Sequence, residues 1–190
     1  SLLPSCSGYE ARTSPDPRTV PSPDPAFSDV SVPIASSFVL SSKLGKEVFI
    51  EPIVNRQTKS IDYKICLGGS KAQLTLASEG TKAGRGANFR CIISGTAITP
   101  DYVKRAGREG LMGQTLLAVV AEGNKGRAYV APREEYTQIA FSAQPTWRPE
   151  GNLPNDPRNF WTVDYGLKTF GDLFTDRQLV ALNTLSSLVH

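Results

Sequence analysis

The sequence has few of the side chains on which most enzymes depend. Its 190 residues include one histidine, His190, and three cysteines, Cys6, Cys66 and Cys91, which are far apart along the chain. Acid–base catalysis most often uses a histidine or a buried pair of carboxyl groups. The sequence contains no Gly-x-Ser-x-Gly elbow, no phosphate-binding P-loop and no His-Glu-x-x-His motif. We therefore expect no complete catalytic site, and we assign no catalytic or cofactor-binding residue.

Long apolar runs are missing as well. No stretch approaches the roughly 20 apolar residues that a membrane span needs, and residues 1–6 have neither the basic start nor the apolar core of a signal peptide. An odd number of scattered cysteines favours isolated, reduced thiols. We expect a cytoplasmic protein with no membrane partner. The first residue is not Met, and a helical pattern runs to His190 without a stop, so we expect a segment of a larger protein.

Proline and glycine, by contrast, are plentiful, with 14 and 16 residues. They predict many loops and short elements. Residues 1–31 are dominated by Ser, Pro and Asp, which predicts an extended opening segment. Residues 32–144 predict a β-rich module with short helices, and 145–190 predict an irregular aromatic segment followed by a C-terminal helix. The expected fold class is α+β, with short antiparallel hairpins and two or three helices.

Hydrophobic patterning and turn residues place the individual elements. Helices are expected to begin at Pro100, at Pro132 and after Thr175, which forms a capping box with Gln178. Leu179, Leu182, Leu185 and Val189 form the apolar stripe of the last helix. Strands are expected at residues 34–40, 47–54, 61–66, 72–76 and 89–93, and a hairpin at 114–121 and 127–130.

The basic residues are concentrated in the middle of the chain. Residues 80–127 hold eight Lys and Arg against three acidic residues, a net charge of +5, while the rest of the chain carries −2. Such a segment is suited to contact phosphate. A solvated face with scattered Lys and Arg explains the pattern equally well. Gly84-Arg85-Gly86 lacks the third glycine of a dinucleotide fingerprint and is interpreted as a flexible basic loop.

A short motif in this segment has the outline of a zinc knuckle. Cys91-Ile92-Ile93-Ser94-Gly95 matches Cys-x-x-Cys-Gly, except that a hydroxyl replaces the second thiol. Zinc needs four nitrogen or sulfur ligands, usually from two such pairs. Serine is a poor ligand at neutral pH and no second cysteine pair exists, so we expect no bound zinc.

Several longer runs of the sequence resemble one protein family. The most specific runs are Gly84-Arg85-Gly86-Ala87-Asn88-Phe89-Arg90-Cys91-Ile92-Ile93-Ser94-Gly95-Thr96, Tyr102-Val103-Lys104, Glu109-Gly110-Leu111-Met112-Gly113, Val119-Val120-Ala121-Glu122-Gly123 with Gly126-Arg127, and Tyr165-Gly166-Leu167-Lys168-Thr169-Phe170-Gly171-Asp172-Leu173-Phe174-Thr175-Asp176-Arg177-Gln178-Leu179. The family that they resemble is the adenine-specific DNA methylases that contain a zinc-ribbon insertion. The resemblance covers nearly the whole chain from about Ala11 onward.

This resemblance implies a parent enzyme whose catalytic domain is split. Members of the family look like S-adenosylmethionine-dependent methyltransferases with an Asp-Pro-Phe-type motif before the insertion and an Asp-Pro-Pro-Tyr motif after it. Neither motif occurs in this chain, and the nearest approach is Asp156-Pro157-Arg158. The chain is then expected to be the insertion alone, without cofactor. S-adenosylmethionine would bind the parent, and its partners would be DNA, through the parent, and its own methyltransferase domain.

The resemblance also implies how the metal site has changed. The first knuckle of zinc-bearing relatives, Cys-Pro-x-Pro-x-Cys, corresponds to residues 22–27, where Ser22 and Phe27 replace the thiolates. The second knuckle corresponds to Cys91 and Ser94. Three of four ligand positions are therefore lost, which implies a degenerate zinc-ribbon-like fold without zinc. Phe27 is hypothesised to fill the space of the metal.

Two functional hypotheses follow. In the first, the chain is a DNA-engaging or target-recognition insertion whose basic side chains contact phosphates, which orient a duplex without reading its sequence. The expected contact residues are Lys82, Arg85, Arg90, Lys104, Arg105 and Arg108. In the second, it is a structural module whose aromatic segment and last helix pack against the catalytic domain. A small enzyme in its own right is the least favoured interpretation.

Overall fold

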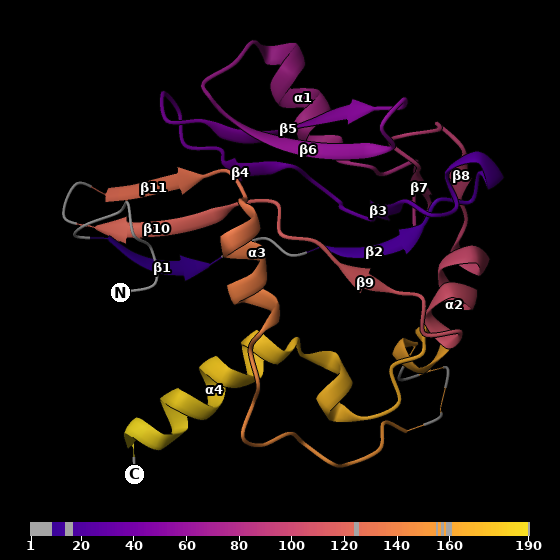
Figure 1. Ribbon diagram of the computed structural model, residues 1–190, viewed down its shortest axis with the longest axis vertical. Helices are drawn as coiled ribbons and strands as arrows, with labels where there is room; N and C mark the ends of the chain where they lie inside the picture. The colour runs from indigo at the N-terminus through magenta and orange to yellow at the C-terminus, as the bar shows by residue number, and fades with distance from the viewer. Residues whose placement is uncertain are drawn as a thin grey trace. The chain divides into compact units, whose positions relative to one another are not determined.

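The computed structural model describes residues 9–13, 17–123, 126–154, 156, 158 and 161–189. Cys6, Lys125 and His190 lie outside the described residues. The described chain is α+β, with four α-helices and several antiparallel sheets of two or three strands (Figure 1). The fold class expected from sequence is confirmed, with one helix more than expected.

The chain forms two compact units, each assembled from two stretches of sequence. The first consists of Ser1–Pro100 and Met112–Pro132, and the second of Asp101–Leu111 and Arg133–His190. These units do not follow the expected boundaries at residues 31 and 144. Early strands pair with strands from residues 113–123, so the opening segment is part of the first unit.

Two sheets of the first unit join the opening segment to the middle of the chain. In one, β1 (Tyr9–Thr13) pairs with β10 (Val119–Gly123), which also pairs with β11 (Gly126–Val130). In the other, β2 (Arg18–Pro21) lies between β3 (Ser31–Pro33) and β9 (Gly113–Gln114). The expected hairpin at 114–121 and 127–130 is therefore present, but its first strand starts at Val119 because residues 116–118 enter the core as a buried connection.

The third sheet holds the longest strands. The strands β5 (Val48–Asn55) and β6 (Ser60–Leu67) pair along their whole length, as the alternating sequence predicts, and the short β4 (Val39–Ser41) pairs with β5. Helix α1 (Lys71–Glu79) packs against β4 and β5 (Figure 1). A buried cluster at this contact contains Ala35, Phe38, Phe49, Ile50, Ala77, Leu117 and Ala118.

The expectation of a strand at residues 72–76 is wrong, because this stretch lies inside α1. Ser70 and Gln73 form a capping box: the Ser70 hydroxyl accepts from the Gln73 N–H, and the Gln73 side chain accepts from the Ser70 N–H. The helix ends at Gly80, whose φ is +58° and where a Cβ atom would lie 2.7 Å from the Ser37 nitrogen. The apolar pattern of this short stretch fits either a strand or a helix, and the start signal at Ser70 and the stop signal at Gly80 determine that it is a helix.

A two-stranded hairpin completes the first unit. Strand β7 (Phe89–Arg90) pairs with β8 (Ala97–Ile98), and residues 91–96 turn between them. The strand expected at 89–93 is therefore shorter, because the chain turns at Cys91. The Gly95 N–H donates to the Cys91 carbonyl at 2.8 Å, and the Cys91 N–H donates to the Thr96 carbonyl at 2.9 Å.

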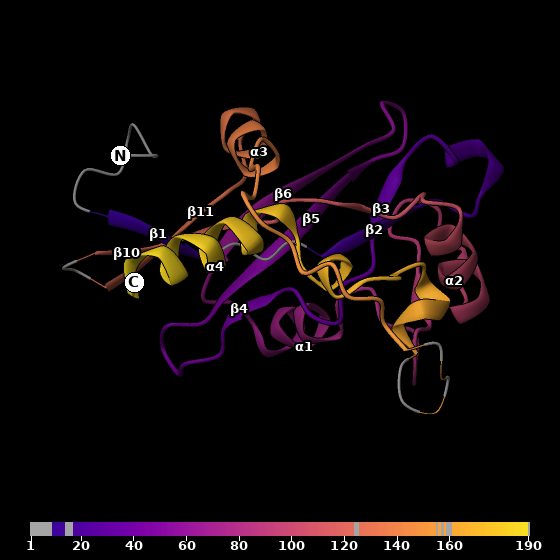
Figure 2. The same ribbon diagram turned by 90° about the horizontal axis from the view of Figure 1, so that it is seen from below.

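The second unit is helical. Helix α2 (Pro100–Arg108) begins at the predicted proline and buries Val103 and Ala106, and α3 (Glu134–Phe141) begins two residues after Pro132. Helix α4 (Asp176–Val189) contacts α3 (Figure 2) and follows the predicted Thr175–Gln178 capping box, in which the Thr175 N–H donates to Gln178 at 2.8 Å. The short 3-10 helices η2 (Thr162–Tyr165) and η3 (Phe170–Leu173) occupy the segment expected to be irregular.

Among the helices of the described residues, none is both long and apolar enough to span a bilayer. The predicted stripe of α4 is buried only at its start. Leu179 is 1% exposed, whereas Leu182, Leu185 and Val189 are 47%, 62% and 85% exposed.

Candidate nucleic-acid interface

The basic loop 82–90 is an ordered hairpin rather than a free loop. Lys82 and Phe89 form an antiparallel bridge, and the Ala83 N–H donates to the Asn88 carbonyl at 3.0 Å. Two glycines with positive φ, Gly84 at +100° and Gly86 at +71°, allow the tight turn between them. The turn places Arg85 at the exposed tip of the hairpin.

The base of this hairpin is fixed to the core by Thr81. The Thr81 hydroxyl is buried, accepts from the Ala35 N–H at 2.9 Å and lies 3.2 Å from the Pro33 carbonyl oxygen. The Thr81 carbonyl accepts from the Arg90 N–H at 2.7 Å. The base of the hairpin is in this way anchored to the core of the first unit.

The three basic side chains of the hairpin differ in how they are held. The Lys82 ammonium lies 5.1 Å from the centre of the Phe89 ring and donates to the Gly86 carbonyl, so it is tied to the hairpin itself. Arg85 and Arg90 are exposed. These two guanidinium groups are the ones best placed to meet a large anionic surface.

Beside the hairpin lies an open hollow of about 690 Å³. It is bounded by β5, by α1, by residues 80–83 and by the turn that follows Arg90. Its lining includes two of the predicted contact residues, Lys82 and Arg90, and a third cation, Arg56, whose Nε atom donates to the Ile93 carbonyl at 2.7 Å. Two carboxylates, Glu51 and Glu79, also line it.

The other three predicted contact residues lie on α2, in the second unit. The Lys104 ammonium donates to Asp164 at 2.8 Å, and this bond raises the pKa of Lys104 and lowers that of Asp164. Arg105 lies 5.1 Å from the centre of the Tyr102 ring, and Arg108 is exposed. Lys104 therefore links α2 to η2. Arg105 and Arg108 are the basic residues of α2 whose side chains are exposed.

The structure thus assigns the six predicted contact residues to two units, three in each. The first unit carries 13 Lys and Arg against 9 Asp and Glu, and the second carries 8 against 9. The first unit therefore has a net charge of +4 and the second of −1, so all of the excess positive charge belongs to the first unit, which also holds the basic hairpin and the hollow. Basic residues that are clustered along the sequence are thus divided between two units.

The two predicted knuckles meet in the first unit. The Ser22 hydroxyl lies 3.2 Å from the Cys91 sulfur, and both residues are at most 2% exposed. Burial opposes ionisation of the Cys91 thiol, but donors from Ser22 and Ser94 and the N–H groups of Ser94 and Ile93 outweigh it and lower its pKa. Positions that the family resemblance pairs as ligands are therefore neighbours, although 69 residues separate them.

The residues at this point do not fit zinc. They supply one thiol and two hydroxyls, and among the described residues no group of three or more His, Cys, Asp or Glu side chains is arranged to hold a metal. Phe27, which we hypothesised to fill the space of the metal, is half-buried, and the contact that the structure shows between the two turns is the one between Ser22 and Cys91.

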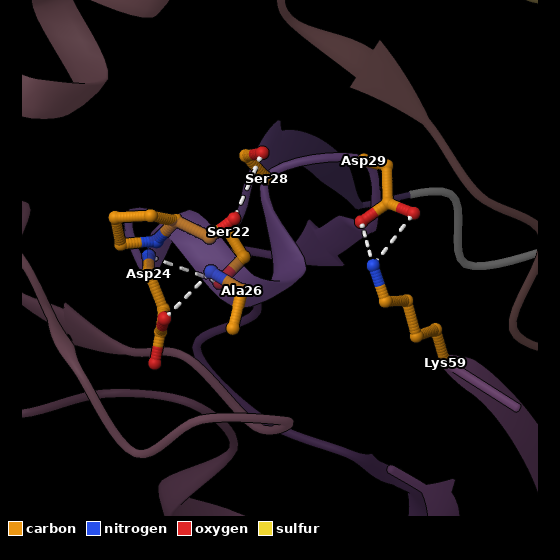
Figure 3. A network of polar contacts seen from close by, with 7 residues as sticks. Ser22, Asp24, Ala26, Ser28, Asp29 and Lys59 are labelled. Atoms are coloured by element: carbon orange, nitrogen blue, oxygen red, sulfur yellow. Dashed lines mark hydrogen bonds and ion pairs between the residues drawn. The ribbon is translucent and has the colours of Figure 1, made fainter. Parts of the chain in front are cut away.

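The turn that carries Ser22 is stabilised by its own polar contacts (Figure 3). The Ser22 hydroxyl accepts from the Asp24 N–H at 3.3 Å, and the Asp24 carboxylate caps the 3-10 helix η1 (Pro25–Phe27) by accepting from the Ala26 N–H at 2.9 Å. Lys59 donates to Asp29 at 2.9 Å, a bond that lowers the pKa of Asp29. The turn is therefore joined to the loop between β5 and β6.

Sequence reasoning missed two residues of the hollow. Arg56 lies in the turn after β5, far in sequence from the other cations, and only the tertiary fold brings it to Ile93. Leu76 was assigned to a strand, but it lies on α1 and lines the hollow while 67% exposed. The Ser70–Gln73 capping box was the available signal for that helix.

No family model, curated protein or solved structure matches this chain. The resemblance to the adenine-specific DNA methylases therefore stays a prediction.

Proposed function

We propose that this chain is a DNA-engaging accessory insertion of an S-adenosylmethionine-dependent adenine-specific DNA methyltransferase, and that it has no catalytic activity of its own. One observation carries the DNA-engaging part. The basic hairpin 82–90 is anchored to the core through Thr81 and presents Arg85 and Arg90 to solvent. The methyltransferase part rests on the sequence resemblance alone.

Arginines presented on an anchored hairpin are suited to hold a phosphate backbone. A guanidinium group can donate two parallel hydrogen bonds to a phosphate, and a fixed support reduces the entropy lost on binding. The excess of positive charge in the first unit adds long-range attraction. Such contacts orient DNA without reading bases, so sequence choice would rest with the parent's catalytic domain. A protein of this kind would work in the cytoplasm, where its thiols stay reduced.

Charge reversal of the hairpin tests this proposal. We expect the wild-type chain to bind a short DNA duplex with an affinity that falls as salt rises. The double variant Arg85→Glu/Arg90→Glu should bind at least about tenfold more weakly. The slope of the logarithm of its binding constant against the logarithm of the salt concentration should be smaller in magnitude by roughly two, about one for each lost phosphate contact. Fluorescence anisotropy over a salt series measures both quantities.

The matched control is Lys43→Glu/Lys46→Glu, which makes the same change in charge on the turn between β4 and β5, outside the hollow. It should retain most of the affinity. Equal losses of affinity in the two double variants would show that net charge alone accounts for binding and that the hairpin has no specific role. A wild-type chain that binds no DNA at low salt would reject the proposal.

A second function is favoured by a different observation, the apolar surface of α4. Leu182, Leu185 and Leu188 are largely exposed, and aromatic side chains of the same unit, Trp147 and Trp161, are 61% and 67% exposed. This surface fits a structural module that packs against a catalytic domain. In the parent enzyme, Arg105→Glu/Arg108→Glu should then leave DNA methylation unchanged, whereas a role of α2 in holding DNA requires methylation to fall.

A further inference from the structure

The hollow beside the basic hairpin has an apolar interior. Pro52 and Val54 on β5 are half-buried, and Leu76 on α1 exposes 67% of its surface. A leucine exposed to that extent beside other apolar side chains offers a contact surface to a flat or apolar ligand. At about 690 Å³ the hollow is within the range of small-molecule sites and far too small for a duplex.

Cations from separate segments stand around this interior. Lys82 and Arg90 come from the two sides of the hairpin, and Arg56 comes from the turn after β5. The Arg56 guanidinium is oriented by its bond to Ile93, and since arginine has five N–H donors this bond leaves others for an anion. An apolar interior beside three cations fits a ligand with a planar, weakly polar part and an attached phosphate.

We propose that the hollow binds one unpaired nucleotide of a DNA strand, with its base against Leu76, Val54 and Pro52 and its phosphates on Arg56, Lys82 and Arg90. This inference rests on the proposed function, because it assumes that DNA is the partner. In a duplex the bases are stacked and paired, and only their edges are accessible in the grooves. A base that leaves the stack exposes its flat face, which a side chain can cover.

The acidic residues of the hollow constrain how the nucleotide is bound. Glu51 accepts from the Cys66 thiol at 3.4 Å and lies 3.9 Å from the Lys64 ammonium, so its charge is partly balanced. Glu79 also lines the hollow, and a carboxylate repels phosphate. The amino group of adenine or cytosine is a suitable partner for Glu79, and phosphates are expected near Lys82 and Arg90.

The test uses single-stranded DNA of about ten nucleotides, within the usual site sizes of single-strand binding folds. One oligonucleotide carries 2-aminopurine, a fluorescent base whose emission reports unstacking, and a second has abasic sites throughout. We expect the intact strand to bind about tenfold more tightly than the abasic one, and Leu76→Gln to remove most of that difference. Leu44→Gln, at a 92% exposed leucine outside the hollow, is the matched control.

The outcomes separate this inference from the proposed function. If the wild type binds DNA and the Arg85/Arg90 variant does not, but intact and abasic strands bind equally, the hollow takes no base and only the inference fails. Loss of binding in Leu44→Gln equal to that in Leu76→Gln overturns it as well. An acidic, leucine-rich peptide whose binding depends on Leu76, while the oligonucleotide's does not, assigns the hollow to a protein ligand and also overturns it.

Discussion

At the scale of single residues, the contact between Ser22 and Cys91 is the most informative. Two turns that correspond to zinc knuckles only by the family resemblance are joined here by one hydrogen bond between a hydroxyl and a thiol, with both residues buried. A metal fixes four ligands at once, whereas this pair fixes two. The chain therefore depends on the surrounding core, including Val20, Ile93 and Ile98, to hold the turns in place.

Removal of the Ser22 hydroxyl tests how much this contact contributes to the free energy of unfolding. We expect Ser22→Ala to lower the free energy of unfolding by about 1–2 kcal/mol, because the buried thiol of Cys91 and the N–H of Asp24 each lose a partner. Urea unfolding followed by circular dichroism measures the change. Ser28→Ala, which removes an exposed hydroxyl bonded to the Pro25 carbonyl, should cost less than about 0.5 kcal/mol. Equal costs would contradict a structural role for the Ser22–Cys91 pair.

At the scale of elements, local signals decided which predictions succeeded. Strands β5 and β6 were predictable from their β-branched, alternating residues, and α4 from the Thr175–Gln178 capping box. The error at α1 arose because a short apolar stretch suits either element and the capping box at Ser70 was overlooked. The hollow was beyond sequence reasoning, since Arg56, Leu76 and Arg90 meet only through tertiary contacts.

The same capping box provides a prediction for α1. Ser70→Ala removes the acceptor of the Gln73 N–H, and we expect it to destabilise the first unit by about 1 kcal/mol. Since α1 forms one wall of the hollow, the variant should also weaken binding of the single-stranded oligonucleotide. Thermal unfolding and anisotropy report the two effects. Ser78→Ala, at an exposed position later in the same helix, is the control, and it should change the free energy of unfolding by less than about 0.5 kcal/mol and leave binding unchanged.

At the scale of the whole molecule, the excess of positive charge and the exposed leucines of α4 belong to different units. The first unit holds the excess of Lys and Arg, and the second holds the exposed leucines of α4. The two proposed functions therefore depend on different surfaces and do not exclude each other. Under the two proposals, the first unit would contact DNA and the second would contact protein.

The exposed stripe of α4 predicts self-association of the isolated chain. We expect a concentration-dependent increase in sedimentation coefficient and binding of a hydrophobic dye, both reduced in Leu182→Glu/Leu185→Glu with helical content unchanged. Ala181→Glu/Ser186→Glu adds the same charge at exposed, less apolar positions of the same helix and serves as the control. A similar reduction in both variants would trace the association to charge and not to the leucines.

The interleaving of the two units has a consequence for how the chain can be taken apart. The backbone passes between them three times, after Pro100, after Leu111 and after Pro132. A protease that cuts one of these connections leaves the units covalently joined through the other two. No single truncation yields either unit alone, because residues 1–132 retain Asp101–Leu111 of the second unit and residues 101–190 retain Met112–Pro132 of the first. A gene for one unit alone would have to join two segments that are separate in the natural sequence.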